Sequence, residues 1–322
     1  MCTQRKNNNM NNKQIKIWGM SYGLIGDLVM GLPLLNYFEK KYPNSYKYWV
    51  IEKKCSFTSP LYLNHPLIDR IKITDEWGLF GKTDLQLVQN CDIVCGKVSN
   101  HVKGGGPASW HDSPDWFNTT SCVEETAKIA GIYDIKEVLT EEELKPKLYK
   151  WFDVGLPESV STYSRANEND LSEFENNIAI WPFATGEAGN RSPSKEWWGK
   201  FISKAISSGY SVYHYGRHTE PTLSSPESSR YKNLTYLPYF EQVKASLASK
   251  LVIGTDSGSQ WVMGAYSHPA INLITNWLPN HNYNLLGLAP INDNGVNIFE
   301  KGGCDNISTD AVLDNIKERV VI

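Results

Sequence analysis

The chain has 322 residues, which is more than one ordinary hydrophobic core supports and enough for two α/β domains of about 150 residues each. Hydrophobic residues make up 41% and charged residues 21%, as in globular proteins, and a net charge of −3 provides no basic face for nucleic acid. No run approaches the roughly 18 apolar residues of a membrane span, and the polar N-terminal segment lacks the apolar centre of a signal peptide. We therefore expect a cytoplasmic protein with at most peripheral contact with the inner face of the cytoplasmic membrane.

The first half of the chain alternates short apolar runs with helical patterns. This alternation is typical of a parallel sheet covered by helices. Residues 1–14, which precede it, are polar and rich in asparagine, and this composition predicts a disordered tail. The predicted elements are, in chain order, a strand at 15–18, a loop at 19–27, a helix at 28–38, strands at 46–51, 71–73 and 92–94, a loop at 102–118 and a helix at 122–130.

The second half repeats this layout after a polar stretch. Residues 154–177 are polar, with many serines and asparagines, and we place a linker at 161–177 within this stretch. It separates a predicted N-terminal domain, residues 15–160, from a C-terminal domain, residues 178–322. The second domain is predicted to contain strands at 178–183, 211–215, 251–255 and 270–275 and helices at 195–208, 240–249, 259–266 and 310–319.

The first motif is GLIGDLVMGLPLL, residues 23–35. Asp27 ends a glycine-containing turn between a strand and a helix, at the sheet edge where open α/β folds bind ligands. Aspartate is also a preferred helix N-cap residue. The spacing alone does not decide between a helix cap and a functional carboxylate, and it does not match the GxGxxG dinucleotide fingerprint.

The second and third motifs lie in the second domain. Residues 181–198, WPFATGEAGNRSPSKEWW, place Arg191 and Lys195 at the start of a helix, where backbone N–H groups and cations together can bind a diphosphate. The alternative is an exposed loop with ordinary surface charges. In LVIGTDSGSQWVMGAYSHP, residues 251–269, a buried strand ends in polar residues and a glycine that suit close contact with a ligand, although helix capping is again the alternative. The residues of this third group are Asp256, Ser257, Gly258 and Ser259.

Taken together and in this order, the motifs resemble glycosyltransferase family nine, the heptosyltransferases that build the lipopolysaccharide core. The resemblance implies an α/β protein of the GT-B fold, in which two Rossmann-like domains face each other across a cleft. It also implies an inverting transfer of heptose or a similar sugar from an ADP-activated donor to a hydroxyl of a glycan or glycolipid. It covers residues 15–274, and its sharpest elements are Gly26-Asp27 with Pro33, Lys195 with Trp197, Gly216 with Glu220, and Asp256-Ser257-Gly258.

The resemblance also assigns roles to single residues. Asp27 matches the aspartate taken as general base at the acceptor hydroxyl, and Lys195 matches the lysine that contacts the donor phosphates. Glu220 matches the carboxylate that binds the ribose hydroxyls, a pairing of two acceptor oxygens with two hydroxyl donors. In the third motif, Asp256 matches a residue that faces the sugar, while Ser257 and Gly258 line the diphosphate.

Two positions depart from the family, both on the donor side. Trp261 stands where the family usually has histidine, and residues 276–278 read Asn-Trp-Leu where the family often has Gly-Pro-Thr. These differences leave the donor sugar and base open, and they leave room for an inactive relative. The predicted acceptor-side residues are Gly26, Trp110 and His111. The last two lie in a glycine-rich loop that either forms an acceptor wall or is a mobile surface loop.

No carboxylates or histidines cluster at metal-ligand spacing, so we expect a metal-independent reaction with a nucleotide sugar as cosubstrate and no cofactor. Two alternatives remain. One is a sugar-nucleotide epimerase of the same architecture, which needs no separate acceptor. The other is a relative that binds a glycan or nucleotide without catalysis.

Overall fold

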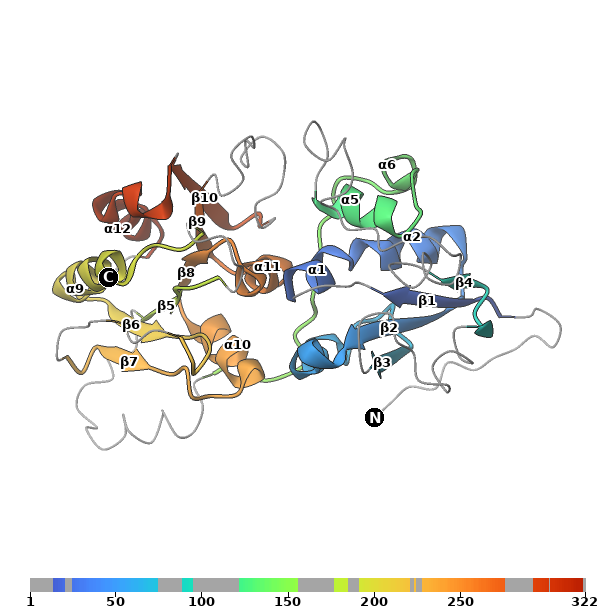
Figure 1. Ribbon diagram of the computed structural model, residues 1–322, viewed down its shortest axis with the longest axis horizontal. Coiled ribbons are helices and arrows are strands. Elements are labelled where there is room, and N and C mark those ends of the chain that lie inside the picture. Colours follow the sequence, from blue (N-terminus) through green and yellow to red (C-terminus); the bar gives the residue numbers. More distant parts are fainter. Residues whose placement is uncertain are drawn as a thin grey trace.

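A computed structural model shows two α/β units arranged side by side along the long axis of the molecule (Figure 1). We refer to the described part of residues 14–155 as the first unit and to that of residues 177–320 as the second. The structure describes residues 14–20, 25–74, 89–94, 122–155, 177–184, 191–220, 223, 228–275, 292–300 and 302–320.

The first unit is built on a parallel sheet, and its described strands follow the order β3-β2-β1-β4. The central strand β2 is buried along nearly its whole length, as expected for a sheet covered on both faces. The strands are β1 (Lys16–Met20), β2 (Tyr46–Glu52), β3 (Arg70–Thr74) and β4 (Ile93–Val94). The helices are α1 (Ile25–Met30), α2 (Pro33–Lys41), the 3₁₀ segment η1 (Lys53–Tyr62), α5 (Cys122–Ile129) and α6 (Ile135–Val138).

The second unit has a longer parallel sheet, with described strands in the order β10-β9-β8-β5-β6-β7. Its chain order reverses between β5 and β8, where doubly wound folds place ligands beyond the carboxyl ends of the strands. The strands are β5 (Asn177–Trp181), β6 (Ser211–His214), β7 (Tyr231–Asn233), β8 (Leu251–Thr255), β9 (Ala270–Thr275) and β10 (Gly295–Glu300). The helices are α9 (Lys195–Ser207), α10 (Tyr239–Ala248), α11 (Gly258–Ala265), the 3₁₀ turn η3 (Cys304–Asn306) and α12 (Thr309–Arg319).

The predicted helix at 28–38 is wrong, because the chain forms two helices there. Helix α1 starts three residues earlier than predicted and ends at Met30, and α2 begins at Pro33. Proline has no N–H to donate, and inside a helix its ring clashes with the carbonyl four residues before it. At the first position of a helix neither problem arises. Pro33 therefore ends one helix and begins the next.

A shared hydrophobic core joins the two units. It contains Leu28 and Trp49 from the first unit together with Trp181 and Trp261 from the second. The segment that follows α6 takes part in this junction. The Leu148 side chain belongs to the core, and its N–H donates to the Ala265 carbonyl at 2.8 Å. Aromatic contacts add to this junction, with Phe57 against Tyr239 and Phe152 against Phe240 at centroid distances of 5.2 and 4.9 Å.

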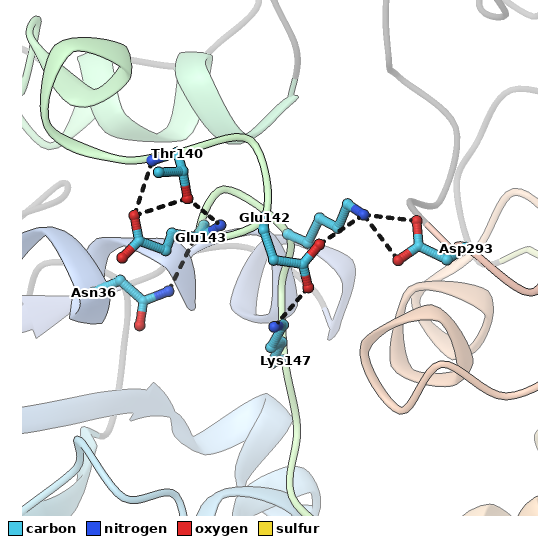
Figure 2. Close-up of polar contacts among 7 residues, drawn as sticks. Asn36, Thr140, Glu142, Glu143, Lys147 and Asp293 are labelled. Carbon is cyan, nitrogen blue, oxygen red and sulfur yellow. Dashed lines mark hydrogen bonds and ion pairs between the residues drawn. The ribbon is translucent and has the colours of Figure 1, made fainter.

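The same segment carries a group of ion pairs (Figure 2). Lys145 contacts both carboxylate oxygens of Asp293 at 2.8 Å and Glu142 at 2.9 Å, and Lys147 also pairs with Glu142. Lys145 thus links the segment to the second unit next to β10. Because Lys145 is half-buried and its partners are exposed, the ion pairs contribute little to stability.

Each sheet comes wholly from one side of the predicted linker. The described strands of the first sheet end at residue 94 and those of the second begin at residue 177. Residues 161–176, which make up nearly all of the predicted linker, lie outside the described residues, as do residues 1–13 of the tail predicted at 1–14. The domain boundaries therefore remain predictions.

Candidate active site

Asp27 lies inside the first turn of α1 and is half-buried. Helix α1 begins at Ile25, so Asp27 is its third residue rather than its N-cap. A carboxylate in a first turn still interacts favourably with the helix dipole, although this effect is small at partly exposed positions. The interpretation of Asp27 as a helix cap is therefore not supported by the geometry.

The start of α1 packs directly against the start of α11. A Cβ on Gly258 would lie 2.6 Å from the Ile25 Cβ and 2.9 Å from the Gly26 nitrogen, so this position has no room for a side chain. A Cβ on Gly26 would lie 3.3 Å from the Trp261 ring. The first and third sequence motifs therefore meet at a contact between two glycines. The structure gives Gly258 a packing role in addition to the ligand contact predicted from the sequence.

Trp261 occupies the position of the family's histidine and is a core residue here. Its side chain is only 4% exposed and belongs to the hydrophobic core that the two units share. The departure from the family pattern therefore has a structural consequence, because a large ring fills the space between α1 and α11.

Arg191 connects the second motif to the third. Its Nη2 donates to the Asp256 backbone carbonyl at 2.9 Å and to the carboxylate at 3.1 Å. Asp256 is buried and Arg191 is half-buried, so the pair is better shielded from solvent than the surface ion pairs. The two residues, predicted separately as donor-binding groups, thus form one unit at the end of β8.

The residues on both sides of Asp256 leave polar groups inside the protein. Ser257 occupies the N-cap position of α11 but makes no side-chain capping hydrogen bond, and its buried Oγ has no partner among the described residues. Thr255, the last residue of β8, also has a buried hydroxyl without a partner there. Ser259 is buried as well. Because buried polar atoms normally find partners, the hydroxyls of Thr255 and Ser257 are suited to a ligand at this sheet edge.

Lys195 is the first residue of α9 and is exposed. The helix start is well fixed, since the Ser194 hydroxyl accepts from the Trp197 N–H at 3.2 Å and the Trp197 ring N–H donates to the Ile307 carbonyl at 2.6 Å. Within the described part of the chain no carboxylate pairs with Lys195. Lys195 thus adds a positive charge at a helix N-terminus, which attracts anions.

Glu220 lies over the backbone of Gly216, where the chain leaves β6. A Cβ on Gly216 would overlap the Glu220 carboxylate, and the φ of Gly216 is +149°, a conformation that side chains disfavour. One carboxylate oxygen, Oε2, is buried and has no partner among the described residues. Burial raises the pKa of Glu220 to about 7, against the opposing effects of the Arg217 backbone hydrogen bond and charge.

The structure adds surroundings that the motifs did not reveal. Cys55 in η1 is buried, and burial raises the pKa of its thiol. Among the charges around it, Lys54 lowers this pKa and Glu52 raises it, and smaller effects come from Asp27, which raises it, and Arg217, which lowers it. Asp27 and Arg217 therefore act on the same thiol, although they come from different units. Arg217 lies within the stretch between Gly216 and Glu220, but nothing in that pattern indicated its proximity to the first unit.

Several predicted residues lie outside the described part of the chain. These are Trp110 and His111 of the predicted acceptor loop and the three residues at 276–278. Among the described residues, no three His, Cys, Asp or Glu side chains come together in a way that would hold a metal ion. No helix in the described ranges has the length and apolar character required to span a bilayer.

No protein-family model and no curated protein matches the sequence. Among solved structures, the chain is similar to Escherichia coli ADP-heptose lipopolysaccharide heptosyltransferase II, with a TM-score of 0.66 at 16% identity over 95% of this chain and 98% of that one. A family 9 glycosyl transferase from Veillonella parvula gives a TM-score of 0.64 at 13% identity, covering 96% of this chain and 97% of that one. The E. coli heptosyltransferase WaaC with ADP gives 0.59 at 14%, covering 95% of this chain and 100% of that one.

Identities this low establish the fold and not the activity. The matches extend over nearly the full length of both chains, so they include both α/β units and their arrangement. The GT-B fold predicted from the motifs is thereby confirmed: this chain has the fold of the heptosyltransferases of glycosyltransferase family nine.

Proposed function

We propose that this protein is an inverting glycosyltransferase that moves heptose or a similar sugar from a nucleotide-activated donor to a hydroxyl of a glycan. An ADP-sugar is the favoured donor, and a lipopolysaccharide core glycan or glycolipid is the favoured acceptor. The reaction is proposed to be metal-independent. The proposal draws on the fold shared with heptosyltransferases. One of these proteins, WaaC, has been solved both with ADP and with ADP-2-deoxy-2-fluoro heptose.

One observation carries this proposal beyond the fold. Gly26 of α1 lies against Gly258 of the second unit, so the residue next to the candidate base Asp27 contacts the candidate diphosphate loop. A transferase needs both groups at one place, because the acceptor hydroxyl must lose a proton as the donor bond breaks. A protein that only binds nucleotides has no such requirement for a carboxylate from the other unit.

In the proposed reaction the acceptor oxygen attacks the anomeric carbon from the face opposite the diphosphate. A new carbon–oxygen bond forms as the bond to the diphosphate oxygen breaks, and the leaving group departs with that electron pair. Asp27 accepts the hydroxyl proton. Lys195 and the amides that follow Asp256 stabilise the charge that develops on the diphosphate. Arg191 already pairs with Asp256, so we propose that it mainly holds this loop in place.

A panel of nucleotide sugars, incubated with and without glycan acceptors, tests the proposed activity directly. Nucleotide release that depends on the acceptor, with a product that joins sugar to acceptor, is the expected result for a transferase. Conversion of the donor alone would indicate an epimerase. An intact donor that nevertheless binds would indicate a non-catalytic relative, and the transferase proposal would then be abandoned.

Glu220 provides a pH-dependent test of the donor site. The proposed role is to accept hydrogen bonds from the ribose hydroxyls, which favours the ionised carboxylate. Because burial raises the pKa of Glu220 to about 7, its protonated form prevails below that pH and nucleotide affinity should fall as the pH is lowered through this value. Without ligand the sign is opposite, since burial disfavours the charged form: stability should decrease as pH rises from 4.5 to about 7.

Calorimetric titration of ADP across this pH range checks the prediction, with Glu220→Gln as the reference. The terminal phosphate of ADP itself titrates at about pH 6 and also makes the affinity depend on pH. The variant retains this contribution of the phosphate and loses the contribution of Glu220. A pH dependence that is the same in parent and variant would contradict the assignment of Glu220 to the ribose.

A further inference from the structure

Gln242 of α10 holds both backbone groups of Gly216. The Gly216 N–H donates to Gln242 Oε1 at 2.8 Å, and Gln242 Nε2 donates to the Gly216 carbonyl at 3.0 Å and to the Leu237 carbonyl at 2.7 Å. The Gln242 side chain is buried, so these bonds are shielded from water. The reverse orientation of the amide would place donor against donor and acceptor against acceptor. The position of Gly216 is therefore fixed from α10.

Gly216 in turn supports the carboxylate of Glu220. A Cβ at this glycine would lie 2.8 Å from the Glu220 Cδ, so the carboxyl group rests directly over the glycine backbone. The Glu220 N–H donates to the Arg217 carbonyl at 3.0 Å, which closes the short turn between the two residues. A shift of Gly216 would consequently move the surface on which the carboxylate lies.

We propose that Gln242 is a positioning residue that sets the Glu220 carboxylate for the two hydroxyls of a ribose. This inference rests on the proposed function, in which Glu220 contacts the ribose. Gln242 lies outside the three sequence motifs and acts through Gly216. Its role gives the site a preference for ligands with vicinal hydroxyls, because two hydroxyl donors require both carboxylate oxygens at defined places.

The variant Gln242→Met removes the amide and keeps a side chain of similar length. It leaves the N–H and carbonyl of Gly216 without their buried partners, and the glycine is free to move. We expect the affinity for ADP to fall about tenfold, because the ribose hydroxyls lose well-formed hydrogen bonds to the charged Glu220 carboxylate. Affinity for 2′,3′-dideoxyadenosine diphosphate should stay close to that of the parent, because this ligand has no hydroxyls for Glu220 to bind.

The experiment is calorimetry with both ligands on the full-length parent, Gln242→Met, Glu220→Gln and a matched control, Glu241→Gln. Glu241 precedes Gln242 in α10, and its carboxylate pairs with Lys244 of the same helix at 3.3 Å. The parent and the control are expected to prefer ADP over the dideoxy ligand. Glu220→Gln and Gln242→Met are both expected to lose most of that preference, and combining them should add little.

Equal weakening of both ligands by Gln242→Met would overturn the inference, because Gln242 would then support the unit as a whole. If circular dichroism shows that this variant is unfolded, Gln242→Leu replaces it, since a shorter apolar side chain removes both the acceptor and the Nε2 donors. Retention of the parental preference in Gln242→Leu would likewise overturn the inference. A parent without preference, or a Glu220→Gln variant that keeps it, would refute the ribose assignment of Glu220 itself.

Discussion

Asp27→Asn is expected to abolish most sugar transfer while leaving nucleotide binding nearly unchanged. The substitution keeps the size of the side chain but removes the basic carboxylate, and losses of a general base amount to roughly a hundred- to ten-thousand-fold. This corresponds to about 3–5 kcal/mol of transition-state stabilisation. The groups proposed to bind the nucleotide belong to the other unit, so the affinity for the donor should not follow the loss of turnover.

A transfer assay and a donor titration on the same preparation measure both quantities. Asp134→Asn is a suitable control, because Asp134 belongs to the same unit and its carboxylate pairs with Lys41 at 2.8 Å at the surface. It should retain full activity. Transfer by Asp27→Asn within a few-fold of the parent would show that Asp27 is not the base. The next candidates would be His111 of the predicted acceptor loop and its neighbour in sequence, Asp112.

Strands and capped helices were predictable because their signals are local. The buried strand β8 is a continuous apolar run, and both of its ends agree with the prediction. Helix α9 begins after the Ser194 cap and ends before Gly209, whose φ is +91°. Residues within a few positions of each other determine these boundaries, so the sequence is sufficient to place them.

The helix predicted at 28–38 failed for an equally physical reason. Apolar residues continue on both sides of Pro33 because α1 and α2 are both packed into the core, and the spacing alone resembles one helix. Strand β10 was missed because it is only partly buried and lacks a strong apolar run. Strand β7 has three residues, too few for a periodic signal.

The site illustrates what a sequence motif leaves open. The motifs indicated Gly26 and Gly258 separately, but their proximity depends on a contact between helices more than two hundred residues apart in the chain. The sequence likewise showed Arg191 and Asp256 as two candidate ligand groups, whereas the structure pairs them with each other. Local patterns identify residue types, and only the packing of the two units determines which of them meet.

Lys195→Ala is expected to lower turnover far more than donor affinity. The departing diphosphate gains negative charge in the transition state, so a cation placed beside it stabilises that state more than the bound donor. Removal of one such group generally costs about a hundred- to a thousand-fold in kcat. The helix itself should persist, because Ser194 still caps it and alanine has the highest helix propensity.

Steady-state kinetics with a donor titration measure kcat and affinity separately. Lys200→Ala is the control, since Lys200 is an exposed lysine of the same helix. If Lys195→Ala instead raises KM and leaves kcat unchanged, the lysine only docks the donor, and the developing charge must be stabilised by the amides that follow Asp256.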